Sequence, residues 1–125
     1  MVIERCKRLD TPCVVFDRAM FSDDAQLLQQ LQAINPDLIV LAGFLWMIPK
    51  SYINAFPNRI INVHPALLPK FGGKGMYGRY VHEAVIASAA SESGITIHYV
   101  NPRYDEGAII FQAKCTVNEI GRAHV

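Results

Sequence analysis

The strongest constraint on the fold is an apolar run at residues 38–42, which reads Leu-Ile-Val-Leu-Ala without a polar side chain. A strand with one face in water alternates apolar and polar residues, whereas a strand covered on both faces does not. The whole apolar stretch at residues 38–48 is far shorter than the ~20 residues needed to cross a bilayer. The run therefore predicts a central strand of a parallel sheet, with no membrane span.

Other strands and helices alternate around this run. Apolar, β-branched segments predict strands at residues 14–16, 60–63, 95–100 and 108–117, and helical spacing predicts helices at residues 2–9, 22–34, 49–55 and 80–90. Ser22 is expected to cap its helix, with Asp23 and Asp24 in the first turn, and Pro49 suits the start of the next. The order predicts an α/β, Rossmann-like, mostly parallel twisted sheet with helices on both faces.

Length and composition limit the domain count and the partners. A chain of 125 residues holds one domain, predicted at residues 1–117, while residues 118–125 lack periodicity and are predicted to be a non-native tail. The net charge of +1 without a basic stripe predicts no nucleic-acid and no membrane partner. No signal peptide is visible, and Cys6, Cys13 and Cys115 fit neither a disulfide framework nor a zinc site, so we expect a cytoplasmic protein without a metal.

Two polar residues meet at the end of the strand at residues 60–63. The two-residue period of a strand places Asn62 and His64 on the same side, just before Pro65. One interpretation is that both side chains only bind local backbone at a turn. The other is a catalytic pair, because an amide can stabilise an oxyanion and an imidazole can move a proton near neutral pH.

A glycine loop and a later acidic loop are further candidates. Residues 73–78 match the letters G-x-G-x-x-G, but they do not follow a strand directly, so a dinucleotide site is not expected. We expect these residues to form a flexible loop on the rim of a site. Asp105 precedes Gly107 in a loop between two strands, where it and Glu106 form either a solvated turn pair or part of the same site. His98 lies on a strand and is, by itself, a half-buried side chain.

The blocks at residues 36–44, 61–69 and 94–100, followed by Asp105 and Gly107, resemble the formyltransferase family over about residues 14–117. The resemblance implies the formyltransferase fold, and transfer of a formyl group from 10-formyltetrahydrofolate to the amine of glycinamide ribonucleotide in purine synthesis. It also implies a first strand and a phosphate-binding loop that we expect to lie before residue 1, so that this fragment alone is predicted to lack half of one substrate site. Small-molecule substrates and a monomer or homodimer are expected.

The resemblance assigns roles residue by residue. Asn62 would donate to the oxyanion, His64 would shuttle a proton, and Asp105 would hold His64 or a water. His98 would lie behind these residues and support them without touching the substrate. The folate would be bound by Asn62, by Arg18 and by the segment Leu45, Trp46, Met47 and Ile48.

Two alternatives remain open. Relatives that formylate methionyl-tRNA would share Asn62, His64 and Asp105, but they carry a different pattern where this chain has residues 71–75, and an additional tRNA-binding domain. A non-catalytic folate-binding fragment would keep the pocket without turnover. An assay of formyl transfer separates these possibilities.

Overall fold

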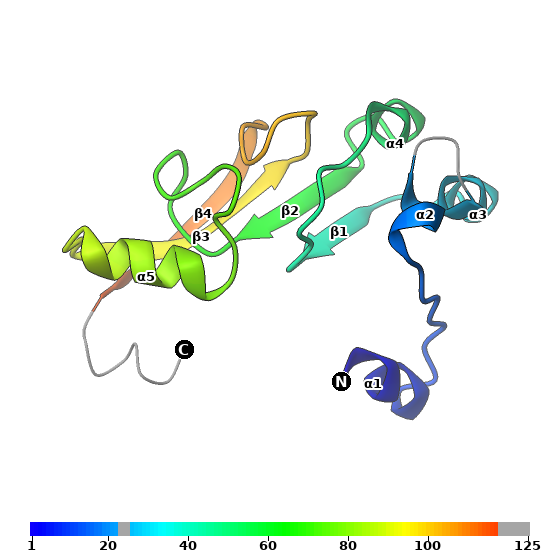
Figure 1. Cartoon of the computed structure of the whole chain (residues 1–125), viewed down its shortest axis with the longest axis horizontal. Coiled ribbons are helices and arrows are strands. Elements are labelled where there is room, and N and C mark those ends of the chain that lie inside the picture. The colour runs from blue at the N-terminus through cyan, green and yellow to red at the C-terminus, as the bar shows by residue number, and fades with distance from the viewer. Residues whose placement is uncertain (23–25, 118–125) are drawn as a thin grey trace.

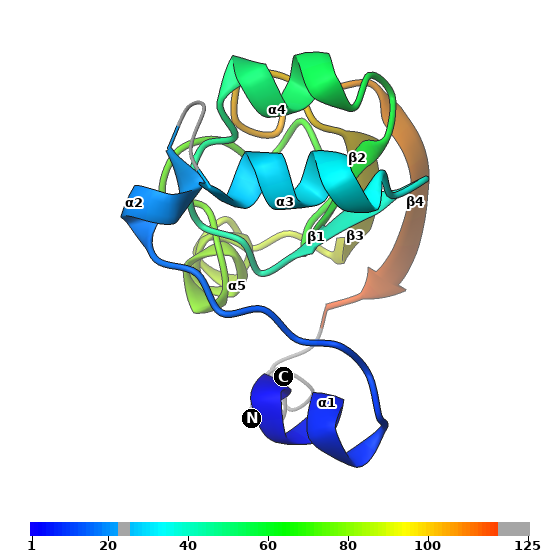
Figure 2. The same cartoon turned by 90° about the vertical axis from the view of Figure 1, so that its right-hand side faces the viewer.

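The computed structural model describes residues 1–22 and 26–117, which contain one four-stranded sheet (Figure 1). In chain order the elements are α1 (Val2–Arg8), α2 (Arg18–Phe21), α3 (Gln26–Ile34), β1 (Ile39–Ala42), α4 (Lys50–Ala55), β2 (Ile60–His64), α5 (Arg79–Ala87), β3 (Glu92–Tyr99) and β4 (Ile109–Thr116). Helices α3 and α4 lie near β1, and α1 stands apart from the sheet (Figure 2). No helix in these two ranges is long and apolar enough to cross a membrane.

The sheet is mixed, so the α/β class is confirmed but the expectation of a mostly parallel sheet is wrong for the described strands. The strand order is β1-β2-β3-β4, in which β1 and β2 are parallel while β2–β3 and β3–β4 are antiparallel. A helix separates β1 from β2 and also β2 from β3, so the alternation of elements alone did not reveal the change of direction. The β3–β4 pair is joined by a loop without a helix, which is the ordinary connection of antiparallel neighbours.

Two strand predictions are corrected. The run at residues 38–42 forms β1, but at the edge of the described sheet, with a half-exposed Val40 (53%) next to partly buried Ile39 and Leu41. Residues 14–16 form no strand, and Val14 and Val15 are exposed. Both corrections have the same physical reason. An extended segment becomes a strand only where a neighbouring strand supplies hydrogen-bond partners, and it becomes a central strand only where strands lie on both sides of it.

The remaining element predictions agree within a few residues. Helix α3 ends at Ile34, before the Asn35-Pro36 pair predicted to stop it, and Pro49 is the N-cap of α4. Helix α2, capped by the Asp17 carboxylate that accepts from the Met20 N–H at 2.9 Å, was not predicted. The predicted positions of Asp23 and Asp24 lie outside the described residues, as does the predicted tail at residues 118–125.

The main core lies between helices α2, α3 and α4 and one face of β1 and β2. Its buried members are Phe21, Leu27, Leu28, Ile48, Tyr52, Phe56 and Ile60. The Tyr52 hydroxyl donates a hydrogen bond to the Phe21 carbonyl at 2.8 Å, which satisfies the polar end of a ring that is otherwise surrounded by apolar atoms. This core fixes the edge of the sheet from which the loop at residues 43–48 emerges.

A close backbone contact fixes the loop between β3 and β4. The Tyr99 N–H donates to the Ala108 carbonyl at 2.9 Å, and a Cβ atom at Gly107 would lie 1.6 Å from the Tyr99 carbonyl oxygen. Only glycine permits this approach, so Gly107 holds the preceding Asp105 against β3.

We therefore expect Gly107→Ala to destabilise the protein. The backbone must shift to relieve the clash, at a cost of about 1–3 kcal/mol, which corresponds to a fall in Tm of roughly 5–15 °C. Thermal unfolding followed by circular dichroism measures the change. Glu106→Ala is the matched control, since the Glu106 side chain is 59% exposed; equal Tm values for the two variants would contradict the prediction.

Candidate active site

The antiparallel register of β2 and β3 brings together the polar residues of the site. Asn62 pairs with His98 and His64 with Thr96, so all four side chains lie on one face of the sheet. The Asn62 Nδ2 atom lies 3.2 Å from His98 Nε2. Thr96 is fully buried; its hydroxyl donates to the Ala66 carbonyl at 2.6 Å and fixes the chain directly after β2.

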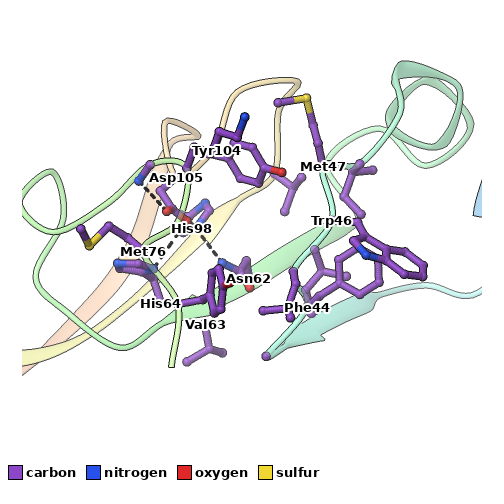
Figure 3. A pocket seen from close by; sticks show the side chains of 18 of the residues that line it. Phe44, Trp46, Met47, Asn62, Val63, His64, Met76, His98, Tyr104 and Asp105 are labelled. Atoms are coloured by element: carbon purple, nitrogen blue, oxygen red, sulfur yellow. Dashed lines mark hydrogen bonds and ion pairs between the residues drawn. The ribbon is translucent and has the colours of Figure 1, made fainter. Parts of the chain in front are cut away.

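Asp105 completes the cluster from the loop after β3. Its Oδ1 atom lies 3.6 Å from His64 Nδ1 and 3.5 Å from His98 Nε2, and its Oδ2 accepts the Gly73 N–H at 2.9 Å (Figure 3). The side chain is only 10% exposed, whereas Glu106 beside it is 59% exposed. The interpretation of Asp105 and Glu106 as a solvated turn pair is therefore wrong for Asp105 and correct for Glu106.

The cluster shifts two proton affinities. Burial would raise the pKa of the Asp105 carboxyl, but the hydrogen bonds from His98 and Gly73 and the charges of both imidazoles lower it below the ordinary value of 3.8. Burial would likewise lower the pKa of His98, but Asp105 and the Tyr99 carbonyl raise it above 6.5. Each shift favours the charged form, so Asp105 and a protonated His98 would stabilise one another.

These shifts predict a pH dependence of stability. The lowered pKa of Asp105 adds stability above its ordinary value of 3.8 that is lost as the pH falls through the folded pKa, and the raised pKa of His98 adds stability below 6.5 that is lost as the pH rises through the folded pKa. The Tm difference between the wild type and Asp105→Asn should thus be largest between these two values, at roughly 3–6 °C for a charge-assisted hydrogen bond of about 1 kcal/mol. A difference that keeps growing towards alkaline pH would contradict this.

His64 is held from both sides. It is 3% exposed, and its Nε2–H donates to the Phe71 carbonyl at 2.7 Å, which leaves Nδ1 facing Asp105. A carbonyl oxygen only accepts hydrogen bonds, so the proton of a neutral His64 ring lies on Nε2. The nitrogen able to take up a further proton is therefore the one beside the carboxylate.

The structure adds two backbone groups that the sequence did not reveal: the Phe71 carbonyl and the Gly73 N–H, bound by His64 and Asp105. The glycine pair at residues 72–73 was the available signal. A Cβ at Gly72 would lie 2.6 Å from Leu68 Cδ2 and 3.2 Å from Asp105 Cβ, so this loop passes the site closely.

A pocket opens beside the cluster, with a volume of about 520 Å³. Asn62, His64, His98 and Asp105 line it, and so does the glycine loop at residues 73–78. The predicted folate segment also lines it in full: Leu45, Trp46, Met47 and Ile48. The structure thus brings the polar cluster and the apolar segment into one cavity.

Trp46 and Arg18 are placed differently from each other. Trp46 lines the pocket at the side away from His64 and packs against Phe44 and Phe21, with ring centroids 5.9 and 5.5 Å apart (Figure 3). Arg18 is not among the residues that line the pocket; its guanidinium lies over the Trp46 ring, 5.4 Å from the centroid. Arg18 thus stands next to a residue that lines the pocket, and its predicted contact with folate stays a prediction.

In the described part of the chain, no group of three or more His, Cys, Asp or Glu side chains is arranged to hold a metal ion. Cys6, Cys13 and Cys115 are free and belong to no disulfide.

An α/β fold in which an amide, two imidazoles and a carboxylate meet beside an apolar pocket has the groups needed for acyl-type group transfer. Comparison with known proteins agrees with this class: the family model described as Formyl transferase matches residues 2–122. The chain belongs to the formyl transferase family.

Individual relatives give the same result. The chain is 46% identical to the chloroplastic phosphoribosylglycinamide formyltransferase of Arabidopsis thaliana, over 85% of this chain and 38% of that protein. It is 38% identical to the phosphoribosylglycinamide formyltransferase of Haemophilus influenzae, over 90% of this chain and 53% of that protein. The crystal structure of glycinamide ribonucleotide transformylase 1 from Symbiobacterium toebii matches with a TM-score of 0.81 and 36% identity, over 94% of this chain and 55% of that one. The chain thus spans about half the length of these relatives or less.

Proposed function

We propose that the protein containing this chain transfers a formyl group from 10-formyltetrahydrofolate to the primary amine of glycinamide ribonucleotide, a step of purine synthesis. The observation that carries the proposal is the convergence of Asn62, His64 and Asp105 in a pocket whose other wall is apolar. The names of the Arabidopsis thaliana and Haemophilus influenzae relatives support the choice of acceptor.

The reaction follows from the chemistry of these groups. The acceptor amine attacks the formyl carbon, a new C–N bond forms, and the formyl oxygen takes up the displaced electron pair. An N–H of Asn62 donates to this oxyanion. His64 accepts the proton of the attacking amine, on the nitrogen that faces Asp105, and returns it directly or through water to the departing folate nitrogen as the old C–N bond breaks. Asp105 stabilises the imidazolium during this step.

The pocket fits a folate. A pterin ring is flat and heteroaromatic, with polar edges and apolar faces, and it suits a wall of apolar side chains joined by a backbone that can form hydrogen bonds. The half-exposed Leu45 and Met47 side chains, 51% and 48% exposed, are free to cover such a ring. Trp46 is held in the aromatic cluster, so we assign its contribution to the backbone and to the edge of the indole.

The proposal also covers the acceptor substrate, the cellular location and the oligomeric state. The net charge of +1 provides no basic surface for RNA, which favours the small nucleotide over methionyl-tRNA. We also propose a cytoplasmic location and a monomer or homodimer for the protein that contains this chain.

The proposal is tested with a chimera in which residues 2–117 replace the matching segment of the Haemophilus influenzae relative. We expect the chimera to transfer the formyl group to glycinamide ribonucleotide and not to methionyl-tRNA. The single tryptophan of this chain, Trp46, reports folate binding to the unfused chain by fluorescence quenching. Folate binding to both proteins without transfer to either acceptor would overturn the enzymatic function, and absence of quenching together with an inactive chimera would overturn the folate site.

A further inference from the structure

The hydrogen bonds of His98 determine which of its nitrogens carries a proton. Its Nδ1 atom lies 2.9 Å from the Tyr99 carbonyl oxygen, and because a carbonyl only accepts, Nδ1 is the donor. In the neutral ring, Nε2 then has a free electron pair. The Asn62 side chain faces that atom at 3.2 Å, so it is the NH₂ end of the amide that points at His98.

We propose that His98 is a positioning residue that sets the orientation of the Asn62 amide, and that protonation of His98 reverses this orientation. The proposal rests on the proposed function of Asn62 as oxyanion donor. With one N–H bound to His98, the NH₂ group keeps its second N–H for the pocket that Asn62 lines. A reversed amide would present its carbonyl oxygen instead, which repels an oxyanion.

The surroundings of His98 explain why a proton changes this arrangement. Asp105 Oδ1 lies 3.5 Å from His98 Nε2 and also 3.6 Å from His64 Nδ1, while the residue paired with His98 on β4 is the apolar Ile109. Asp105, which is shared with His64, is therefore the ionisable side chain within ion-pair distance of His98 in the described part of the chain. A proton added at Nε2 is stabilised by the nearby carboxylate charge of Asp105, and it removes the acceptor of the Asn62 N–H.

The reversal then follows from hydrogen bonding. A protonated Nε2 faces an amide nitrogen that also carries protons, so a half-turn of the Asn62 side chain about its terminal bond restores a good contact with the amide oxygen. Burial lowers the pKa of His98, but Asp105 and the Tyr99 carbonyl outweigh it, so the pKa lies above 6.5. Protonation is thereby brought closer to physiological pH.

Nuclear magnetic resonance of the isotope-labelled chain tests the orientation without any assay of activity. The Asn62 side-chain NH₂ signal, identified by its loss in Asn62→Ala, should shift with the same apparent pKa as the His98 ring between about pH 5 and pH 9. In His98→Gln this shift should vanish, because the glutamine carbonyl accepts the same N–H but does not titrate. The Gln112 amide, which binds Thr96 and the Leu68 carbonyl, should not follow the titration and serves as the control. A constant Asn62 signal while His98 titrates, or a neutral His98 ring protonated on Nε2, would overturn the proposal.

Kinetics of the chimera provide the second measurement. We expect His98→Leu to lower kcat roughly tenfold or more, with KM and Trp46 quenching nearly unchanged, because only the transition state uses the amide orientation. His98→Gln should recover most of the loss and reduce the fall of kcat at acidic pH. Equal losses in two variants that both remain folded by circular dichroism would overturn the proposal. An inactive wild-type chimera would instead contradict the proposed function, while the resonance experiment would still decide the orientation.

Discussion

Replacement of His64 by alanine is expected to lower kcat of the chimera by about 10²–10⁴-fold, the usual contribution of a positioned proton-transfer group. The free nitrogen of His64 faces the Asp105 carboxylate in the pocket, whereas the corresponding nitrogen of His98 is bound by the Asn62 amide. Folate affinity, measured by Trp46 quenching, should change little, because the segment proposed to bind folate is residues 45–48, which line another part of the cavity.

The matched control for this variant is His82→Ala. His82 lies on α5, is partly buried and does not line the pocket, so its loss should leave kcat unchanged. If His64→Ala weakened folate binding as much as it slowed turnover, His64 would be a binding residue and its assigned role would be wrong.

For Asn62→Ala the expected loss of kcat is about 10²–10³-fold, because one oxyanion donor commonly contributes that factor. The loss should appear in kcat and kcat/KM alike, since the donor acts on charge that develops only in the transition state. Steady-state kinetics of the chimera measure it.

Asn54→Ala is the control for the loss of an amide side chain. Asn54 is exposed on α4 and does not line the pocket, and its removal should leave both kcat and KM unchanged. An increase in KM without a fall in kcat for Asn62→Ala would show that Asn62 binds the ground state and does not stabilise the oxyanion.

Much of the site was predictable because it depends on short-range rules. The two-residue period of a strand places Asn62 and His64 together without knowledge of the rest of the fold. The family resemblance added Asp105, which local pattern alone assigned to a solvated turn as readily as to a site. Arg18 was predicted to bind folate; the structure places its guanidinium over Trp46, one of the residues that line the pocket, and its contact with folate stays a prediction.

Long-range features were not predictable in the same way. The direction of β3 relative to β2, and the position of β1 at the edge of the described sheet, depend on which strand edges meet in space. No sequence pattern identified the Phe71 carbonyl and the Gly73 N–H as partners of the site, because every residue other than proline carries both groups and only chain packing selects among them.

The sequence by itself determined the α/β class, the order and approximate limits of most elements, and the identity of the polar residues at the strand end, because each follows from periodicity, turn chemistry or local spacing. Only the tertiary structure decided the strand directions, the close passage of Gly107 against Tyr99, and the placement of Asp105 between His64 and His98. The physical reason is that a carboxylate in a loop is equally compatible with water until the fold removes it from water and surrounds it with donors. Burial and the two imidazoles then give Asp105 its lowered pKa and its place in the site.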